Sequence, residues 1–449
     1  MAQTDPRSKV GAARAADAIF TPAYRGYVLA VLCLGYVVNV MDRSVLGVLI
    51  ESIKHEFGAS DTLLGMLGGI AFALFYATFG IPIAAWADRS NRRNVLALSI
   101  LLWTAMTILC GLAATFWWLL LARIGTAIGE AGGTPPSHSL ISDYFSLRGR
   151  ATALSLYALG VPIGAMVGSY AGGWLNEFYG WRHAFILVAI PGLLVALLVR
   201  FTVAEPPRGH ADRVSVATAS APTPPIREVL KYLWSLRSFR HLCLAAGLHS
   251  FVWYAGSTWN APFLVRSHGM TSGQTGTWLA AFAAIGAIGT LTGGILADRL
   301  SVRKGDRRWY MWVPGYATLI MLPFQFFSYL APGLSLVFTS FSVMTVLASF
   351  FFGPSFAMAQ SLATLRMRAI ATSLMLFIQT LIGLGLGPFF VGVISDLLRP
   401  SSGNQSLAYG LVIVGMVNLW AAVHYFRGAR TLREDLATTE RLGRSTRER

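Results

Sequence analysis

The feature that most constrains this chain is a series of long apolar segments that recur along its whole length. Each is long enough for a helix to cross about 30 Å of hydrocarbon, which takes roughly 20 residues. Of the 449 residues, 55% are hydrophobic and 12% are charged, about half the charged share of a soluble domain. The sequence therefore predicts an all-α membrane protein with twelve transmembrane helices, at residues 27–49, 62–86, 95–114, 116–139, 150–173, 183–203, 241–265, 273–297, 310–330, 333–361, 369–394 and 405–426.

The 36 Lys and Arg residues are distributed unevenly between alternate loops. If both termini lie on one side, almost all of these residues fall in the two tails and the even-numbered loops. Such an excess marks the cytoplasmic side, so we expect a multi-pass protein of the inner or plasma membrane with both termini in the cytoplasm. The net charge of +16 then indicates topology and contacts with anionic membrane lipids, and not nucleic-acid binding. The exceptions are Lys54, Arg182, Arg266 and Arg399 in odd-numbered loops, and Arg43 and Arg123 within segments.

A break in the apolar pattern divides the chain into two six-helix units. Ala211–Pro225 is rich in Ala, Ser, Thr and Pro, a composition typical of flexible linkers. In Ile226–Phe239 the apolar residues have the spacing of a short helix on the membrane surface. We expect a cytoplasmic tail at 1–26, bundles at 27–202 and 240–427 joined by a linker at 203–239, and a basic tail at 428–449.

The two halves repeat a motif after their second segment. Asp88, Arg89 and Arg92 follow the second segment, and Asp298 and Arg299 follow the eighth. One charged turn at a helix end is common, but two copies at equivalent positions indicate an internal duplication. Charge pairs between neighbouring helix ends can close or release an inner gate, so these five residues are the candidates for a cytoplasmic gate.

Four ionisable residues lie inside the apolar segments, where a charge costs about 2.5–3.5 kcal/mol. Asp42 and Arg43 are in the first segment, and Arg123 and Glu130 are in the fourth. Arg123 and Glu130 are seven positions apart, on one helical face and roughly 10 Å apart along the axis. One interpretation is a set of structural ion pairs, Asp42 with Arg43 and Arg123 with Glu130. The other is a pathway for a charged species.

The second interpretation gives these residues roles in transport. Burial raises the pKa of a carboxylate and a neighbouring arginine lowers it, so a cavity that opens to alternate sides could load and release a proton. Asp42, Glu130 and Arg123 are the minimum set for such proton coupling. The planar guanidinium of Arg123 could also bind a phosphate or carboxylate in two places at once, and an anionic headgroup would then compete with Glu130 for it.

Other residues in or near the segments are weaker candidates for substrate contact. Trp and Tyr more often belong to interfacial belts or helix packing than to ligand sites. A histidine changes charge near neutral pH, but a buried, hydrogen-bonded histidine is the more common case. The substrate-binding candidates are Arg123, Arg43, Asn39, Tyr157, His249 and Trp253.

Several motifs resemble the major facilitator superfamily over essentially the whole chain. After the second segment, Ala87, Asp88, Arg89, Arg92 and Arg93 match the family's loop pattern, Gly-x-Leu-Ala-Asp-Arg-x-Gly-Arg-Arg, and Ala84 and Asn91 replace its two glycines. The resemblance implies two pseudo-symmetric six-helix bundles around a central cavity. The other matching residues are Gly294, Leu296, Ala297, Asp298 and Arg299 in the second copy, Arg123-x-Gly125-x-x-x-Gly129-Glu130 in the fourth segment, and Gly160-x-Pro162-x-Gly164-x-x-x-Gly168 in the fifth.

A narrower resemblance, mainly in the N-terminal half, is to the Spinster branch, whose animal members are linked to lysolipids and sphingosine phosphate. It implies a secondary active transporter that works by alternating access, coupled to protons, and moves an amphipathic lipid-like or organic anion. The matching residues are Met41-Asp42-Arg43, Asp88-Arg89-x-Asn91-Arg92, Gly129-Glu130-Ala131, Ile141-x-Asp143-x-Phe145, Pro162-x-Gly164 and Glu205-Pro206-Pro207-Arg208-Gly209.

Other function classes fit less well. No metal-ligand spacing, phosphate-cradling loop or nucleophile–base set is present, so we do not expect an enzyme, a metal or a cofactor. A small organic anion transporter of the same superfamily and a non-transporting sensor on the carrier fold stay as alternatives. We expect a monomer whose partners are its substrate, protons and membrane lipids.

Overall fold

The computed structural model describes residues 20–211, 225–364 and 367–448, and all regular elements within these ranges are helices. Every one of the twelve predicted segments coincides with helical structure. The helices of the N-terminal half are α2 (Pro22–Phe57), α3 (Asp61–Gly68), α4 (Ile70–Arg89), α5 (Arg92–Gly111), α6 (Phe116–Ala131), α7 (Thr134–Tyr144), α8 (Leu147–Ala158) and α9 (Gly160–Thr202).

The C-terminal half repeats this arrangement with more interruptions. A short π-helix, η2 (Gln379–Leu386), replaces the middle of the eleventh segment, and a 3-10 turn, η1 (Ser349–Phe351), interrupts the tenth. The remaining helices are α10 (Ile226–Ser235), α11 (Arg237–His268), α12 (Ser272–Lys304), α13 (Trp309–Leu330), α14 (Leu334–Ala348), α15 (Phe352–Ser361), α16 (Arg368–Ile378), α17 (Gly387–Ser402), α18 (Ser406–Gly415) and α19 (Val417–Glu448), with the 3-10 turn η3 at Gly403–Gln405.

Seven helical stretches of the described residues are long and apolar enough to cross a membrane. Some of them contain more than one predicted segment: the stretch Thr152–Thr202 covers the fifth and sixth. The chain reverses within this stretch at Gly180, whose φ of 78° is readily adopted only by glycine. The count of seven apolar stretches is thus consistent with twelve transmembrane helices, because one stretch can contain two helices.

The connection between the halves contains one short helix, α10, in the stretch where a membrane-surface helix was predicted. Val229 and Leu233 of α10 are buried, and Ile226 and Trp234 are exposed. The central part of the predicted linker, residues 212–224, lies outside the described residues. The last helix, α19, continues past residue 427, where a tail was expected to begin, because Leu432 and Leu436 pack into the apolar cluster formed around α10 and α11.

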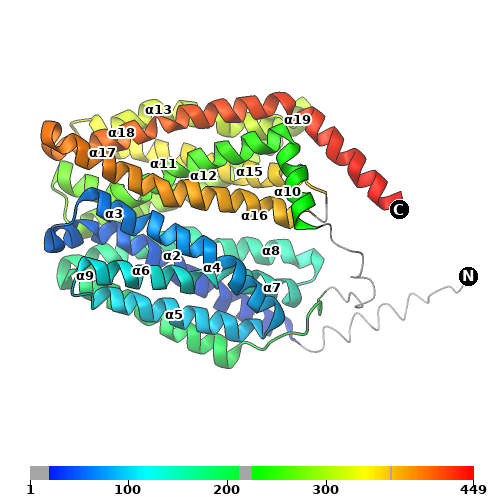
Figure 1. Cartoon of the computed structure of the whole chain (residues 1–449), viewed down its shortest axis with the longest axis horizontal. Helices are drawn as coiled ribbons and strands as arrows, with labels where there is room; N and C mark the ends of the chain where they lie inside the picture. Colours follow the sequence, from blue (N-terminus) through cyan, green and yellow to red (C-terminus); the bar gives the residue numbers. More distant parts are fainter. Residues whose placement is uncertain (1–19, 212–224, 365–366, 449) are drawn as a thin grey trace, which may run out of the picture.

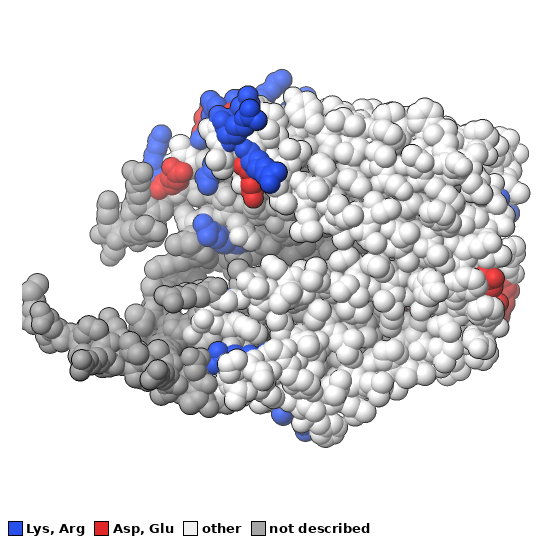
Figure 2. Space-filling view, turned by 180° about the vertical axis from the view of Figure 1, so that it is seen from behind, with Lys and Arg blue, Asp and Glu red and all other residues white. Residues whose placement is uncertain are grey.

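The two halves lie side by side with their helices roughly parallel (Figure 1). Figure 2 shows a hollow between them at the end where most Lys and Arg side chains gather. We call this the open end; it carries the turn between α4 and α5 (Figure 1). The opposite end, with the turn between α2 and α3, is the closed end.

Small residues bring the halves into contact toward the closed end. A Cβ atom at Gly65 of α3 would lie 2.5 Å from the carbonyl oxygen of Pro388 in α17. A Cβ atom at Gly69, between α3 and α4, would lie 2.7 Å from the carbonyl oxygen of Gly385 in η2. Such close backbone approach is how helices pack in lipid, and larger side chains would separate the halves here.

Candidate functional site

The four ionisable residues of the first and fourth segments meet between α2 and α6. Nη1 of Arg123 donates to Oδ1 of Asp42 over 3.2 Å, and Nε of Arg43 donates to Oε2 of Glu130. The predicted pairings, Asp42 with Arg43 and Arg123 with Glu130, are therefore wrong. Adjacent residues point about 100° apart on a helix, and residues seven apart are separated by two turns, so each arginine pairs with an acid on the neighbouring helix.

Three of these four residues are buried. Asp42, Arg123 and Glu130 are at most 3% exposed, whereas the side chain of Arg43 is 27% exposed. The hydroxyl of Thr107 on α5 donates a second hydrogen bond to Asp42. Oε1 of Glu130 has no hydrogen-bond partner among the described residues. Both carboxylate oxygens of the buried Asp42 therefore accept hydrogen bonds. The buried Glu130 is bonded, among the described residues, only to the partly exposed Arg43.

Aromatic rings of α4 cover both guanidinium groups. The Cζ atoms of Arg43 and Arg123 lie 5.2 and 4.9 Å from the ring centre of Phe72, and Cζ of Arg43 lies 4.8 Å from that of Tyr76. These are cation–π distances. Tyr254 of α11 and Leu384 of η2 pack into the same apolar cluster. The exposed part of Arg43 consequently lies where the two halves meet.

Sequence reasoning missed Thr107, Phe72 and Tyr76, although all three contact the ionisable residues. A threonine and two aromatic residues in apolar segments are too common to be distinguished by type. One signal was available: Phe72 and Tyr76 are four residues apart and so share a face of α4, the face that the arginines contact.

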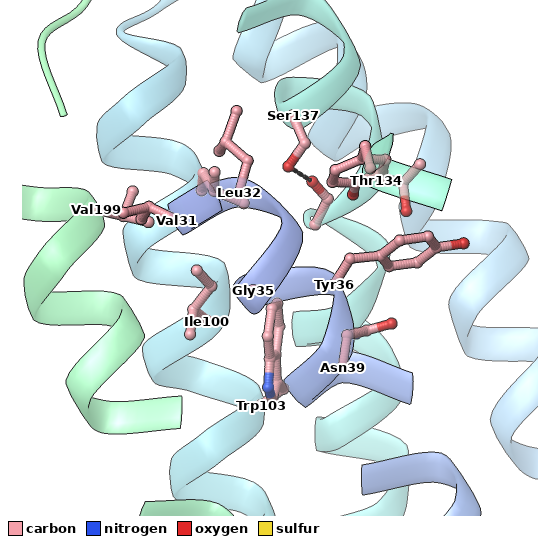
Figure 3. A pocket seen from close by; sticks show the side chains of 13 residues that line it. Val31, Leu32, Gly35, Tyr36, Asn39, Ile100, Trp103, Thr134, Ser137 and Val199 are labelled. Carbon is pink, nitrogen blue, oxygen red and sulfur yellow. Dashed lines mark hydrogen bonds between the residues drawn. The ribbon is translucent and has the colours of Figure 1, made fainter. Parts of the chain in front are cut away.

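Two of the substrate-binding candidates lie beside a small pocket within the N-terminal half (Figure 3). Asn39 of α2 and Tyr157 of α8 both line it, together with Trp103 of α5. Nδ2 of Asn39 and Nε1 of Trp103 are buried and have no hydrogen-bond partner among the described residues. The ring of Tyr157 stacks on that of Tyr36 with 4.6 Å between their centres. Asn39 is one helical turn from Asp42, so this pocket is next to the ionisable site.

The other two candidates lie in the C-terminal half, apart from the ionisable site. His249 is 2% exposed, and its Nε2 lies 2.9 Å from the carbonyl oxygen of Ala348 while its Nδ1 lies 3.2 Å from the hydroxyl of Thr318. These contacts fit the buried, hydrogen-bonded role. Trp253 is half-buried and packs edge-on against Phe352, with 5.7 Å between ring centres.

The candidate gate residues differ in their surroundings at the open end. Asp88, Arg89 and Arg299 are exposed and have no hydrogen bond or ion pair within the part of the chain that the structure describes. Asp298 accepts a hydrogen bond of 2.5 Å from Tyr310 of α13. Arg92 is 1% exposed and has several partners, which are described below. Their role in gating stays a prediction.

The partners of Arg92 belong to α7 and to the residues that directly follow α9. Its guanidinium pairs with Asp143 at the end of α7, donates to Glu205 over 2.7 Å and donates to the carbonyl oxygen of Pro206 over 2.9 Å. The hydroxyl of Ser139 accepts a further bond of 2.9 Å. Arg92 thus ties α5 and α7 to the segment that follows α9.

The arrangement favours the movement of charge over covalent chemistry. Two acids and two guanidinium groups lie close together near the junction of the halves, and one guanidinium is partly accessible. No group of three or more His, Cys, Asp or Glu side chains that could hold a metal occurs among the residues described.

Comparison with known proteins agrees with this architecture. The family model of the Major Facilitator Superfamily matches residues 32–388. A bacterial homologue of the human lysosomal transporter Spinster, crystallised in an inward-facing and unoccupied conformation, shares 33% identity and superposes with a TM-score of 0.84, over 93% of this chain and 99% of that one.

The curated relatives include an efflux pump and two transporters with named substrates. An MFS-type efflux pump of Mycolicibacterium smegmatis is 33% identical over 91% of this chain and 93% of its own length. The sphingosine-1-phosphate transporter SPNS2 of Mus musculus is 27% identical over 92% of this chain and 78% of its own length. A cis,cis-muconate transport protein of Acinetobacter baylyi is 28% identical over 60% of this chain and 65% of its own length.

Proposed function

Because the chain belongs to the major facilitator superfamily, whose members are membrane transporters and not enzymes, we propose that it is a Spinster-like secondary transporter. It carries an amphipathic, lipid-like anion by alternating access and is driven by protons. The open end faces the cytoplasm, as the concentration of Lys and Arg there favours (Figure 2). Both termini are then cytoplasmic.

One observation carries the mechanism: Arg43 is the accessible partner of a buried acid. Its guanidinium pairs with Glu130, whose side chain is fully buried, while 27% of its own side chain is exposed where the halves meet. A phosphate or carboxylate entering from the cleft would bind Arg43 and weaken its bond to Glu130. A buried carboxylate without a charged partner is costly, so Glu130 would then take up a proton.

Asp42 and Arg123 have a complementary role in this proposal. They form a buried pair beside the first, with Thr107 as a further donor to the acid. Arg123 also lies against Phe72, the ring that Arg43 contacts. A displacement of Arg43 would therefore change the surroundings of both ion pairs. A proton could then pass between the two acids as the cavity opens to alternate sides of the membrane.

The experiment is flux into reconstituted vesicles with an imposed pH gradient, using radiolabelled sphingosine 1-phosphate, a lysophospholipid and cis,cis-muconate. Glu130→Gln and Asp42→Asn keep size and hydrogen bonding but remove the titration, so we expect pH-driven flux to be abolished while binding survives. Arg43→Lys keeps the charge but loses the planar donor pair and should weaken binding. Glu228→Gln, on the exposed face of α10, is the control.

The outcomes separate the alternatives. Flux like that of the wild type in both acid variants would rule out proton coupling through Glu130 and Asp42, and the pairs would then be structural. Transport of muconate but of neither lipid would favour a small-anion transporter. Binding of a ligand, detected as thermal stabilisation, without flux of any would favour a sensor.

A further inference from the structure

A second cluster of charged residues joins the two halves at the closed end. Its centre is Asp61, the first residue of α3, which is fully buried. Nη1 and Nη2 of Arg266, near the end of α11, donate to its two carboxylate oxygens over 2.8 and 3.0 Å. Ser395 of α17 donates over 2.6 Å, and Lys54 of α2 also pairs with it. The carboxylate of Asp61 is thus contacted from both halves, by Arg266 and Ser395 of the C-terminal half and by Lys54 of the N-terminal half.

The cluster continues on both sides of Asp61. Nε of Arg266 donates to Glu51 of α2 over 2.7 Å. In the opposite direction, the carboxylate of Asp396 accepts from the backbone N–H groups of Asp61 and Thr62 over 3.0 and 2.7 Å. Asp396 of the C-terminal half therefore satisfies the exposed donors at the start of a helix of the N-terminal half, a favourable place for a negative charge.

These contacts exist only while the closed end is shut. Separation of the halves there would remove both acids from Arg266 and would remove Asp396 from the start of α3. Asp61 would keep only Lys54, which belongs to its own half. Bidentate, charge-assisted bonds are among the stronger interactions in proteins. The cluster therefore stabilises the conformation in which the closed end is shut and does not stabilise the other. Such a difference is what shifts a conformational equilibrium.

Given the alternating access proposed above, on which this inference rests, we propose that Asp61, Arg266 and Asp396 form the gate at the closed end. The gate breaks and re-forms once in each transport cycle, and its strength sets the ratio of the two open states. These residues do not touch the substrate; they act on the conformation in which the substrate is accessible.

The test measures the distance between the halves at the closed end. Spin labels are attached through Tyr179→Cys and Asn404→Cys, both exposed and in different halves, after replacement of the three native cysteines. Double electron–electron resonance is recorded for the wild type, Asp61→Asn, Arg266→Gln and their combination. A matched control is Glu56→Gln, because Glu56 lies at the same end but its partners, Arg182 and Trp181, belong to its own half.

We expect Asp61→Asn and Arg266→Gln each to raise the proportion of long distances about fivefold or more. Their combination should add little, because both remove the same contact. Asp396→Asn, which keeps the shape of the side chain, should give a smaller shift in the same direction. Size-exclusion chromatography of each variant verifies that it is folded.

Two results would overturn the gate. Distances in Asp61→Asn and Arg266→Gln like those of the wild type would do so, as would an equal shift in Glu56→Gln. Failure of alternating access itself would give a different result. The distance between the two labels would then be short in the wild type and in every variant, even in a pH gradient, and no flux would occur in vesicles.

Discussion

The two ends of this molecule use ion pairs in different ways. At the closed end, Arg266 of the C-terminal half pairs with Asp61 and Glu51 of the N-terminal half. At the open end, Arg92 pairs with Asp143 of α7 and with Glu205, which directly follows the N-terminal bundle. The C-terminal half repeats this local arrangement, since Asp306 pairs with Arg308 and Arg433.

This difference separates two consequences of electrostatic bonding. In the proposed alternating access, pairs within one half would remain intact as the halves move, so they would contribute to the stability of each bundle. Pairs between the halves would break, so they would contribute to the balance between conformations. Substitutions at the two ends should therefore change different measured quantities, and the predictions below test that distinction.

The largest effect on stability is expected for Arg92→Ala. Removal of this buried guanidinium leaves Asp143 and Glu205 without their partner, which typically costs about 3–5 kcal/mol. The free energy of unfolding in detergent should fall by that amount. The closed-end distance described above should not change. Arg93→Ala is the matched control, because within the described ranges the Arg93 side chain makes only longer bonds of 3.2 and 3.4 Å, to Asn94 and to the carbonyl oxygen of Val203. A loss below about 1 kcal/mol for Arg92→Ala would contradict the structural role.

Asp88→Asn should have a smaller effect, on the conformational balance and not on stability. Asp88 is exposed and unpaired among the described residues of this form, so the substitution leaves this form unchanged. The substitution destabilises only the form in which the two halves approach each other at the open end. The population of the present form should rise by a few fold, consistent with an interaction of about 1 kcal/mol or less. This direction is opposite to that of Asp61→Asn.

Labels placed across the open end would measure the shift, with Glu228→Gln as a control for the loss of one exposed acid. Unchanged distances in Asp88→Asn would remove this residue from the gate. A shift in the same direction as Asp61→Asn would contradict the comparison between the two ends.

The smallest effect is expected for the pH dependence of the stability that Asp306 contributes, which should be absent across the physiological range of pH. Hydrogen bonds from Arg308, with a further bond from Arg433, lower the pKa of Asp306 to about 2, against about 3.9 in an unfolded chain. Its contribution to stability is therefore complete above pH ~4 and is lost as the pH falls toward 2. The melting temperatures of wild type and Asp306→Asn should differ by a constant amount from about pH 8 to 5 and converge below about pH 3. Convergence near neutral pH would contradict the lowered pKa.

The sequence predicted the twelve segments because the length of an apolar run is a local property. It also predicted that Asp42, Arg43, Arg123 and Glu130 matter together, because charges in such segments are rare. It did not predict which acid pairs with which arginine, since that depends on how α2 and α6 are rotated against each other.

The closed-end cluster could not be found in the same way. Asp61 directly follows a capping serine, Ser60, and an acid at that position is expected at any helix start. Its partner Arg266 lies 205 residues further along the chain, near the end of α11, at a position that the sequence assigned to a loop as an exception to the charge asymmetry. Only the docking of the two halves brings them together.

The close contact of Gly65 and Gly69 with Pro388 and Gly385 has a mechanical consequence. This contact lies at one end of α4, so a rotation of the halves about it would make the helix a lever. Its 20 residues span roughly 30 Å. A rotation of about 15°, as in known rigid-body transitions, would move its far end by roughly 8 Å. A small rotation at these backbone contacts would thus become a large displacement at the open end.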